Sequence, residues 1–149
     1  MATEAQFGEI RRAGRLLARK ITRTAWEANV LSTFNWLLIG HLIGDWVLQS
    51  DWMASGKRRN RWNAAGTAHY TIYSAVVLSA LWLSGIRGQS PAFYLCMGAM
   101  IFGTHWFIDG THLIDRWMQF CGQGPDRIVR LMVDQTFHIV VLAVAATLS

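Results

Sequence analysis

The sequence predicts an all-α membrane protein, a bundle of four transmembrane helices preceded by a basic amphipathic helix. Of its 149 residues, 52% are hydrophobic and only 15% are charged, whereas about a quarter of the residues in a typical soluble domain are charged. The charges are also clustered, which leaves long stretches with almost none. A helix needs about 20 apolar residues to cross a bilayer. We therefore divide the chain into a basic segment, residues 1–30, and a transmembrane domain, residues 31–149.

The basic segment is predicted to form a helix on a membrane surface. Phe7, Ile10, Leu17 and Ile21 recur at three- and four-residue steps, while arginine and lysine occupy much of the remaining surface. A nucleic-acid-binding arm is the alternative explanation of these charges, but no aromatic stacking platform or recognition motif accompanies them. We expect membrane lipid as the partner, and no nucleic acid.

Four apolar stretches are predicted to cross the membrane. Two of them contain AVVLSALWL (75–83) and IVVLAVAATLS (139–149), which lack the polar face that soluble helices normally keep. A soluble four-helix bundle with a very apolar core is the alternative. The predicted spans are residues 31–50, 68–84, 91–117 and 131–149.

Each predicted span carries a histidine at a similar depth. Because consecutive spans alternate in direction, the loops at 50–66 and 121–127 emerge on the same face. At about 1.5 Å per residue, the four histidines lie roughly 12 to 16 Å from that face. They are His41, His69, His105 and His138. The opposite half of the predicted membrane region contains no Asp, Glu, His, Lys or Arg, so this clustering indicates a function.

Other polar residues share helix faces with these histidines. Side chains three or four residues apart stack on one side of a helix. An ionisable group in hydrocarbon costs at least a few kcal/mol, so it normally faces the bundle interior and pairs with another group. The sets are His41, Asp45 and Gln49, then His105, Asp109 and His112, then Asp134 and His138.

These residues predict an intramembrane metal site. Imidazole together with carboxylate is the ligand mixture that zinc, manganese and iron favour. One or two divalent ions would explain the whole set. A structural hydrogen-bond network, a proton relay and haem binding are the alternatives. The candidate ligands are His41, Asp45, His69, His105, Asp109, His112, Asp134 and His138.

Several motifs resemble a bacterial membrane-protein family of unknown function. The family pattern is HxxxDxxxQxxxMxxxK, then H, HxxxD and DQxxH, and the resemblance covers about residues 34–148. Similar arrangements of His and Asp occur in membrane-bound metal-dependent hydrolases. The resemblance implies a multi-pass protein of the inner membrane. The matching segments are HLIGDWVLQSDWMASGK (41–57), His69, HWFIDGTHLID (105–115) and DQTFH (134–138).

Hydrolysis of a lipid-linked phosphoester or ester is the first functional prediction. A metal ion can activate water, with Asp45 or Asp115 as the general base. Lys57 and the arginines that follow it would attract an anionic headgroup. Gln49 and Gln135, which belong to the matching motifs, complete the predicted substrate-binding set.

A non-enzymatic accessory subunit of a larger membrane complex is the second functional prediction. Such a subunit would bind haem or another pigment, with a membrane protein or a second copy of the chain as its partner. The sequence contains no CxxCH haem-attachment motif. The orientation of the protein in the membrane is left open. The loops at 50–66 and 121–127 would lie on one side of the membrane and the basic segment on the other, so both sides would be rich in positive charge.

Overall fold

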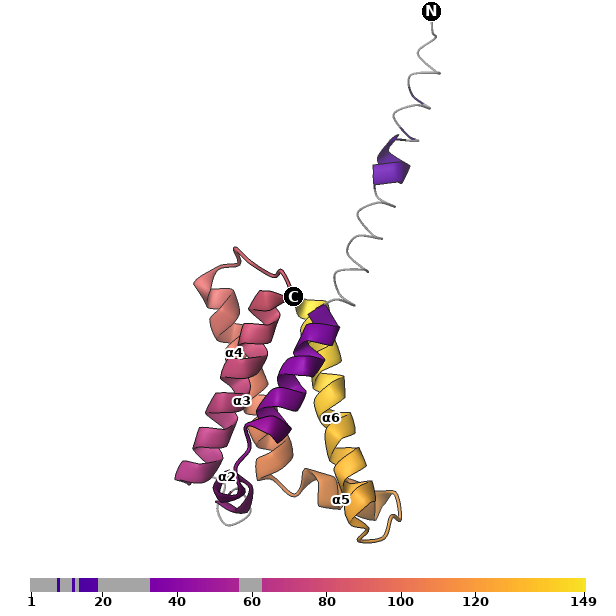
Figure 1. Cartoon of the computed structure of the whole chain (residues 1–149). Helices are drawn as coiled ribbons and strands as arrows, with labels where there is room; N and C mark the ends of the chain where they lie inside the picture. Colours follow the sequence, from indigo (N-terminus) through magenta and orange to yellow (C-terminus); the bar gives the residue numbers. More distant parts are fainter. Residues whose placement is uncertain (1–7, 9–11, 13, 19–32, 57–62) are drawn as a thin grey trace, which may run out of the picture.

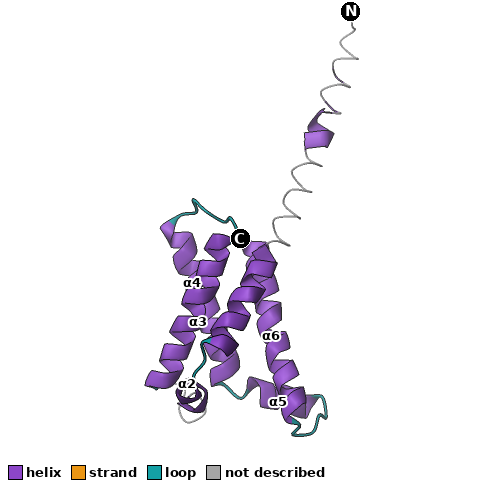
Figure 2. Ribbon diagram, viewed as in Figure 1, coloured by secondary structure: helices purple, strands orange, loops and turns teal. Residues whose placement is uncertain are grey.

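The structure, a computed structural model, describes residues 8, 12, 14–18, 33–56 and 63–149, and within these ranges every regular element is a helix (Figures 1 and 2). An α-helix at 33–42 continues directly into the π-helix η1. The named elements are η1 (Ile43–Val47), α2 (Asp51–Gly56), α3 (Ala64–Leu83), α4 (Pro91–Gly110), α5 (Leu113–Phe120) and α6 (Arg127–Leu148). The all-α prediction is therefore confirmed for the described residues.

Polar residues set the beginnings of the three long helices. The Asn63 side chain accepts a hydrogen bond from the Gly66 amide at the start of α3. Ser90 caps α4 in the same way, with a proline at the first helical position, and Asp126 accepts from two amides at the start of α6. Such caps satisfy backbone N–H groups that have no partner within the helix. The boundaries of α3, α4 and α6 thus follow from local chemistry.

The long helices lie side by side with alternating direction (Figure 1). Helix α3 packs against η1, α2 and α4, while α4 also packs against α5 and α6. The short helices α2 and α5 lie at one end of the bundle, and the α3–α4 connection and the C terminus lie at the other (Figure 1). We call the end with α2 and α5 the α2/α5 end. The apolar core in the opposite half is formed by Leu37, Tyr73, Val77, Leu81, Ile86, Met97, Ile101, Leu142, Ala145 and Ala146.

The helix at 33–42 approaches α3 closely through two glycines in GHLIG (40–44). A Cβ atom on Gly40 would lie 2.8 Å from the Ala80 Cβ, and one on Gly44 would lie 3.2 Å from the Tyr73 Cα. Small residues four positions apart allow two helix backbones to approach in this way. The close approach brings Asp45 against α3.

Gly40→Val is expected to destabilise the protein by about 1–3 kcal/mol, since the added methyl groups have no space against Ala80. The matched control is Gly103→Val in α4, because a Cβ on Gly103 meets no atom within 4 Å. Thermal unfolding of both variants in detergent measures the difference. Equal melting temperatures would contradict the close packing.

The expectation of four spans is met in part. Among the described helices, α4 and α6 are long and apolar enough to cross a membrane, with mean hydropathies of 1.3 and 1.7. The described helix at 33–47 is shorter, and α3 carries His69, Tyr70 and Tyr73 in its first half. The polar residues that mark the site therefore lower the apolar character of these segments.

Two predicted spans also end earlier than expected. The first, predicted to run to residue 50, loses its helical conformation after Val47, and α2 follows. The third, predicted to run to residue 117, stops at Gly110 because Thr111 is extended, with φ −115° and ψ 176°. The Thr111 hydroxyl then accepts a hydrogen bond from the Leu113 amide, at 3.2 Å, as α5 begins. The interruption turns α5 away from α4.

The basic amphipathic helix predicted for residues 1–30 falls mostly outside the described residues. Residues 14–18 are helical and exposed.

Candidate metal centre

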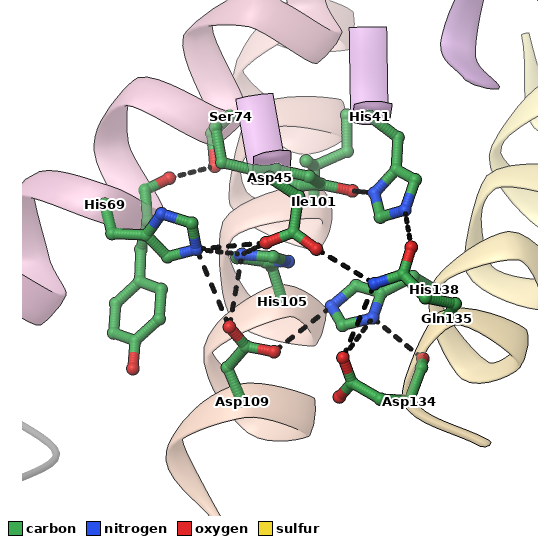
Figure 3. A network of polar contacts seen from close by, with 12 residues as sticks. His41, Asp45, His69, Ser74, Ile101, His105, Asp109, Asp134, Gln135 and His138 are labelled. Carbon is green, nitrogen blue, oxygen red and sulfur yellow. Dashed lines mark hydrogen bonds and ion pairs between the residues drawn. The ribbon is translucent and has the colours of Figure 1, made fainter. Parts of the chain in front are cut away.

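Four buried side chains converge near the α2/α5 end of the bundle, beside residues of α2 and α5. Figure 3 shows them pointing toward one another. We call Asp45, His69, His105 and Asp109 the His/Asp cluster. They come from η1, α3 and α4, and one donor atom from each lies within 4.8 Å of the others. The side chains are at most 5% exposed. Residues far apart in the sequence thus form one compact group of potential ligands.

The donor atoms of the His/Asp cluster have the spacing of a metal site. The Nε2 atom of His69 lies 2.9 Å from Nε2 of His105, 3.3 Å from Asp45 Oδ1 and 3.6 Å from Asp109 Oδ2. Nε2 of His105 lies 3.9 Å from Asp45 Oδ1 and 3.7 Å from Asp109 Oδ2. Ligands about 2.0–2.1 Å from a tetrahedral metal ion are separated by about 3.3 Å. The cluster therefore fits an ion with two imidazole and two carboxylate ligands.

The π-helix η1 aims Asp45 at this group. The Leu48 amide donates a hydrogen bond of 2.9 Å to the carbonyl of Ile43, five residues earlier, whereas an α-helical amide donates to the carbonyl four residues earlier. One wide turn of this kind shifts the side chains that follow relative to a regular α-helix, and such turns occur frequently at functional sites. Asp45 lies within the wide turn and points into the bundle (Figure 3).

A hydrogen-bond chain holds Asp45 in place. A carboxylate can only accept, so the Gln135 amide group donates from Nε2 to Asp45 Oδ2 at 3.0 Å. The Gln135 carbonyl oxygen consequently accepts from Nε2 of His41 at 2.8 Å. The other His41 nitrogen, Nδ1, lies 3.1 Å from the Tyr73 hydroxyl, which donates to it when the ring is neutral. We call Tyr73, His41, Gln135 and Asp45 the hydrogen-bond chain.

The hydrogen-bond chain determines the role of His41. Because its Nε2 carries a proton that points at Gln135, this nitrogen has no lone pair for a metal ion. His41 is fully buried and lies outside the two groups of residues that could hold a metal. His41, a predicted ligand, is thus linked to Asp45 through Gln135 and helps to orient the Asp45 carboxylate.

His138 and Asp134 form a second group with Asp109. Nε2 of His138 lies 3.5 Å from Asp109 Oδ1, while Nδ1 of His138 lies 2.9 Å from the Asp134 carbonyl oxygen. The donor atoms of Asp109, Asp134 and His138 lie within 4.8 Å of one another. Asp109 therefore belongs to both groups.

A cavity of about 850 Å³ opens beside the two groups. Its volume falls in the range of ligand-binding sites in proteins. Three short segments form its wall: the end of η1 with α2, the α4–α5 junction, and the first turns of α6. The lining residues include Asp45, Trp46, Gln49, Asp51, Asp109, His112, Asp115, Arg127, Arg130, Asp134 and Gln135.

Other predicted site residues lie outside the His/Asp cluster. The His112 side chain is 72% exposed and lies 3.5 Å from Asp115, because the end of α4 at Gly110 removes it from the face of His105 and Asp109. Asp115 forms an ion pair with Arg130 on the cavity wall. Gln49 also lines the cavity, and Lys57 lies outside the described residues.

Tyr73 contacts the His/Asp cluster and is absent from the predicted set. Its ring stacks on His105 with centroids 3.6 Å apart and planes inclined by 7°. Tyr73 follows His69 by four residues, so the spacing along α3 already places both on one helix face. Stacking fixes the plane of the His105 ring and covers the cluster on the side of the apolar core.

Comparison with known proteins identifies the family and gives no function. No curated protein matches the chain, and no solved structure matches it. A family model described as "Protein of unknown function (DUF3307)" matches residues 33–149, the region that contains the His/Asp cluster, the hydrogen-bond chain and the cavity. Because this match covers most of the sequence, the chain belongs to the DUF3307 family.

Proposed function

We propose that the chain is a multi-pass inner-membrane protein that binds a divalent metal ion and hydrolyses a lipid-linked phosphoester or ester. The observation that carries the proposal is the His/Asp cluster, whose four donor atoms lie within 4.8 Å of one another. The hydrogen bond between Nε2 of His69 and Nε2 of His105, 2.9 Å long, uses one proton, and the two carboxylates that face these nitrogens can only accept. With neutral rings the group therefore has more acceptors than protons, and a cation would balance them.

The exposed surface supports a membrane location. Only 22% of the apolar window of α4 and 28% of that of α6 are buried inside the protein, whereas the core helix of a soluble protein is covered on most sides. Large apolar side chains are exposed along the helices, which is the arrangement expected where lipid is the solvent. Examples are Trp36, Leu95, Ile128, Val140 and Leu148.

In the proposed hydrolysis the His/Asp cluster binds the metal ion, and the cavity holds the substrate. A bound zinc, manganese or iron ion would activate water and polarise the phosphoryl or acyl oxygen of the substrate. Asp45, buried and fixed by Gln135, serves as a ligand in this arrangement, and Asp115 on the cavity wall remains the candidate general base. The cavity lies at the α2/α5 end of the bundle, so a lipid headgroup at the membrane surface can enter it.

Arg127→Ala is expected to raise the KM for an anionic substrate about tenfold and to leave metal content unchanged. Arg127 lines the cavity at the first turn of α6, and a hydrogen bond to a charged group contributes about 1.5–3 kcal/mol. Arg87→Ala is the matched control, because Arg87 lies over Trp82 beyond the opposite end of α3. Equal KM values for the two variants would remove Arg127 from substrate binding.

The test of the proposed function uses the full chain purified in detergent without chelators. Elemental analysis should find a divalent transition metal bound to the protein. The metal-loaded protein should then release phosphate from phosphatidate, or fatty acid from an ester lipid, in mixed micelles, and a chelator should stop the reaction. Protein that retains no metal after incubation with zinc, manganese or iron would refute the proposal.

The accessory-subunit function is the second candidate, and the exposed aromatic side chains favour it. Trp46, Phe107 and Phe120 are more than half exposed and could contact a partner protein as well as lipid. Haem is a poor fit to the His/Asp cluster, because Nε2 of His69 and Nε2 of His105 are only 2.9 Å apart and leave no room for a macrocycle between them. Metal binding without hydrolysis, together with stable capture by a membrane complex, would favour this candidate.

A further inference from the structure

We infer that the site holds two metal ions, with Asp109 as the bridging ligand between the His/Asp cluster and a second position formed by His138 and Asp134. The inference rests on the proposed metal-dependent function and adds the number of ions and the ligands of the second one. Three observations carry it. The two oxygens of Asp109 face different ligand sets, Nε2 of His138 has no hydrogen-bond partner among the described residues, and the described lining of the cavity is negatively charged.

Asp109 presents its two oxygen atoms to two different sets of ligands. Its Oδ2 atom lies 3.6 Å from Nε2 of His69 and 3.7 Å from Nε2 of His105. Its Oδ1 atom lies 3.5 Å from Nε2 of His138 (Figure 3). A carboxylate whose oxygens face opposite ligand sets is suited to bridge two ions, as in sites where two metals lie about 3.5–4 Å apart.

His138 carries a lone pair aimed at this second position. A carbonyl oxygen only accepts, so Nδ1 of His138 donates to the Asp134 carbonyl at 2.9 Å, and in the neutral ring Nε2 is an acceptor. The Nε2 atom has no hydrogen-bond partner among the described residues, and the side chain is only 2% exposed. Its distance of 3.5 Å to Asp109 Oδ1 is longer than a normal N–H···O hydrogen bond.

A cation at this position would satisfy the His138 nitrogen. Two acceptors that face each other in a buried site repel, and burying an unpaired polar nitrogen costs about 1–3 kcal/mol. The bond from Nδ1 to a backbone carbonyl also fixes the ring orientation, as is usual for metal-binding histidines. His138 thus has the tautomer and the direction of a ligand.

Asp134 completes the second position on the cavity side. Its side chain is 25% exposed, lines the cavity, and has a donor atom within 4.8 Å of Asp109 and His138. Three protein ligands leave coordination positions open, which is typical of catalytic metal ions. The second ion would therefore contact the substrate directly from the cavity.

For an anionic substrate, the charge of the cavity is a further argument for a second ion. Its described lining contains five carboxylates, those of Asp45, Asp51, Asp109, Asp115 and Asp134, against the guanidinium groups of Arg127 and Arg130. With neutral histidines the lining has an excess of three negative charges. One divalent ion leaves one negative charge, whereas two make the lining positive. Two ions would therefore make the described lining attractive to an anionic headgroup.

The experiment measures metal stoichiometry in the full chain. Protein in detergent is stripped, incubated with Mn²⁺ and freed of excess metal; elemental analysis then counts the ions, and electron paramagnetic resonance detects magnetic coupling between them. We expect two ions per chain and a coupled signal for the wild type. His138→Ala and Asp134→Asn should each bind one ion and lose the coupling. His112→Ala is the matched control and should keep both ions, because His112 is exposed and lies apart from both groups.

The outcomes separate this inference from the proposed function. One ion per wild-type chain, with no loss in His138→Ala or Asp134→Asn, would overturn the second position and leave the single-metal function standing. Two ions in both variants would overturn the ligand assignment. A wild type that binds no metal would refute the proposed function as well. Unchanged size-exclusion profiles and circular dichroism show that the variants are folded.

Discussion

Replacing His105 by alanine is expected to remove metal from the His/Asp cluster and to lower hydrolytic activity roughly a thousandfold. Nε2 of His105 lies within 4 Å of His69 Nε2, Asp45 Oδ1 and Asp109 Oδ2, so its loss breaks the group at its centre. A metal ion contributes several kcal/mol to transition-state stabilisation, and about 4 kcal/mol corresponds to this factor. Elemental analysis and the micelle assay measure the two effects.

A second variant separates loss of the ligand from loss of packing. His105→Ala also removes the stacking partner of Tyr73 and leaves space in the bundle. Asp109→Asn keeps the volume of the side chain and removes its charge, so it should lose metal and activity with little change in the melting temperature. His112→Ala serves as the histidine control for metal content. Full metal content and activity in both His105→Ala and Asp109→Asn would refute the metal site.

Depth and helical spacing predicted that several of these side chains would lie close together. All five histidines were expected to meet, and the structure brings His69, His105 and His138 next to the same carboxylate, Asp109. His41 lies close by in the hydrogen-bond chain, whereas His112 is exposed and lies apart. The i, i+4 pairs on α4 and α6 lie on continuous helix, so their shared faces survive in the structure. Regular geometry is what a sequence pattern predicts well.

The sequence could not predict the features that break regular geometry. The i, i+4, i+7 pattern of His105, Asp109 and His112 assumed a helix that continues past Gly110, but Thr111 is extended and its hydroxyl accepts a hydrogen bond from the Leu113 amide as α5 begins. The wide turn at Ile43–Val47 likewise leaves no clear signal in the residue types; it lies where this segment packs against α3. Local backbone choices of this kind are decided by tertiary contacts.

The roles of individual polar residues also depend on hydrogen-bond direction, which no spacing reveals. His41 matches the depth of the other histidines, yet its Nε2 proton points at Gln135 and makes it a support for Asp45. Gln135, expected at the substrate, is 8% exposed and links His41 to Asp45. Three-dimensional placement was needed to separate the residues that could bind a metal ion from those that orient them.

Gln135→Leu is expected to weaken metal binding about 10- to 100-fold while the His/Asp cluster itself stays intact. The Gln135 amide accepts from His41 and donates to Asp45, so leucine, of similar size, breaks both bonds. Loss of groups that orient metal ligands costs this factor in affinity. The buried His41 N–H group, which loses its acceptor, should also lower the free energy of unfolding by about 1–3 kcal/mol. Titration of stripped protein with zinc measures the affinity.

The control is Gln119→Leu, since Gln119 is exposed on α5 and neither Asp45 nor His41 contacts it in the hydrogen-bond chain. Raising the metal concentration should restore the activity of Gln135→Leu, because the ligands remain, whereas it should not restore His105→Ala. A substrate contact would behave differently: metal affinity would stay at the wild-type value and KM would rise. That result would return Gln135 to the substrate-binding role expected from its motif and would leave Asp45 without its positioning partner.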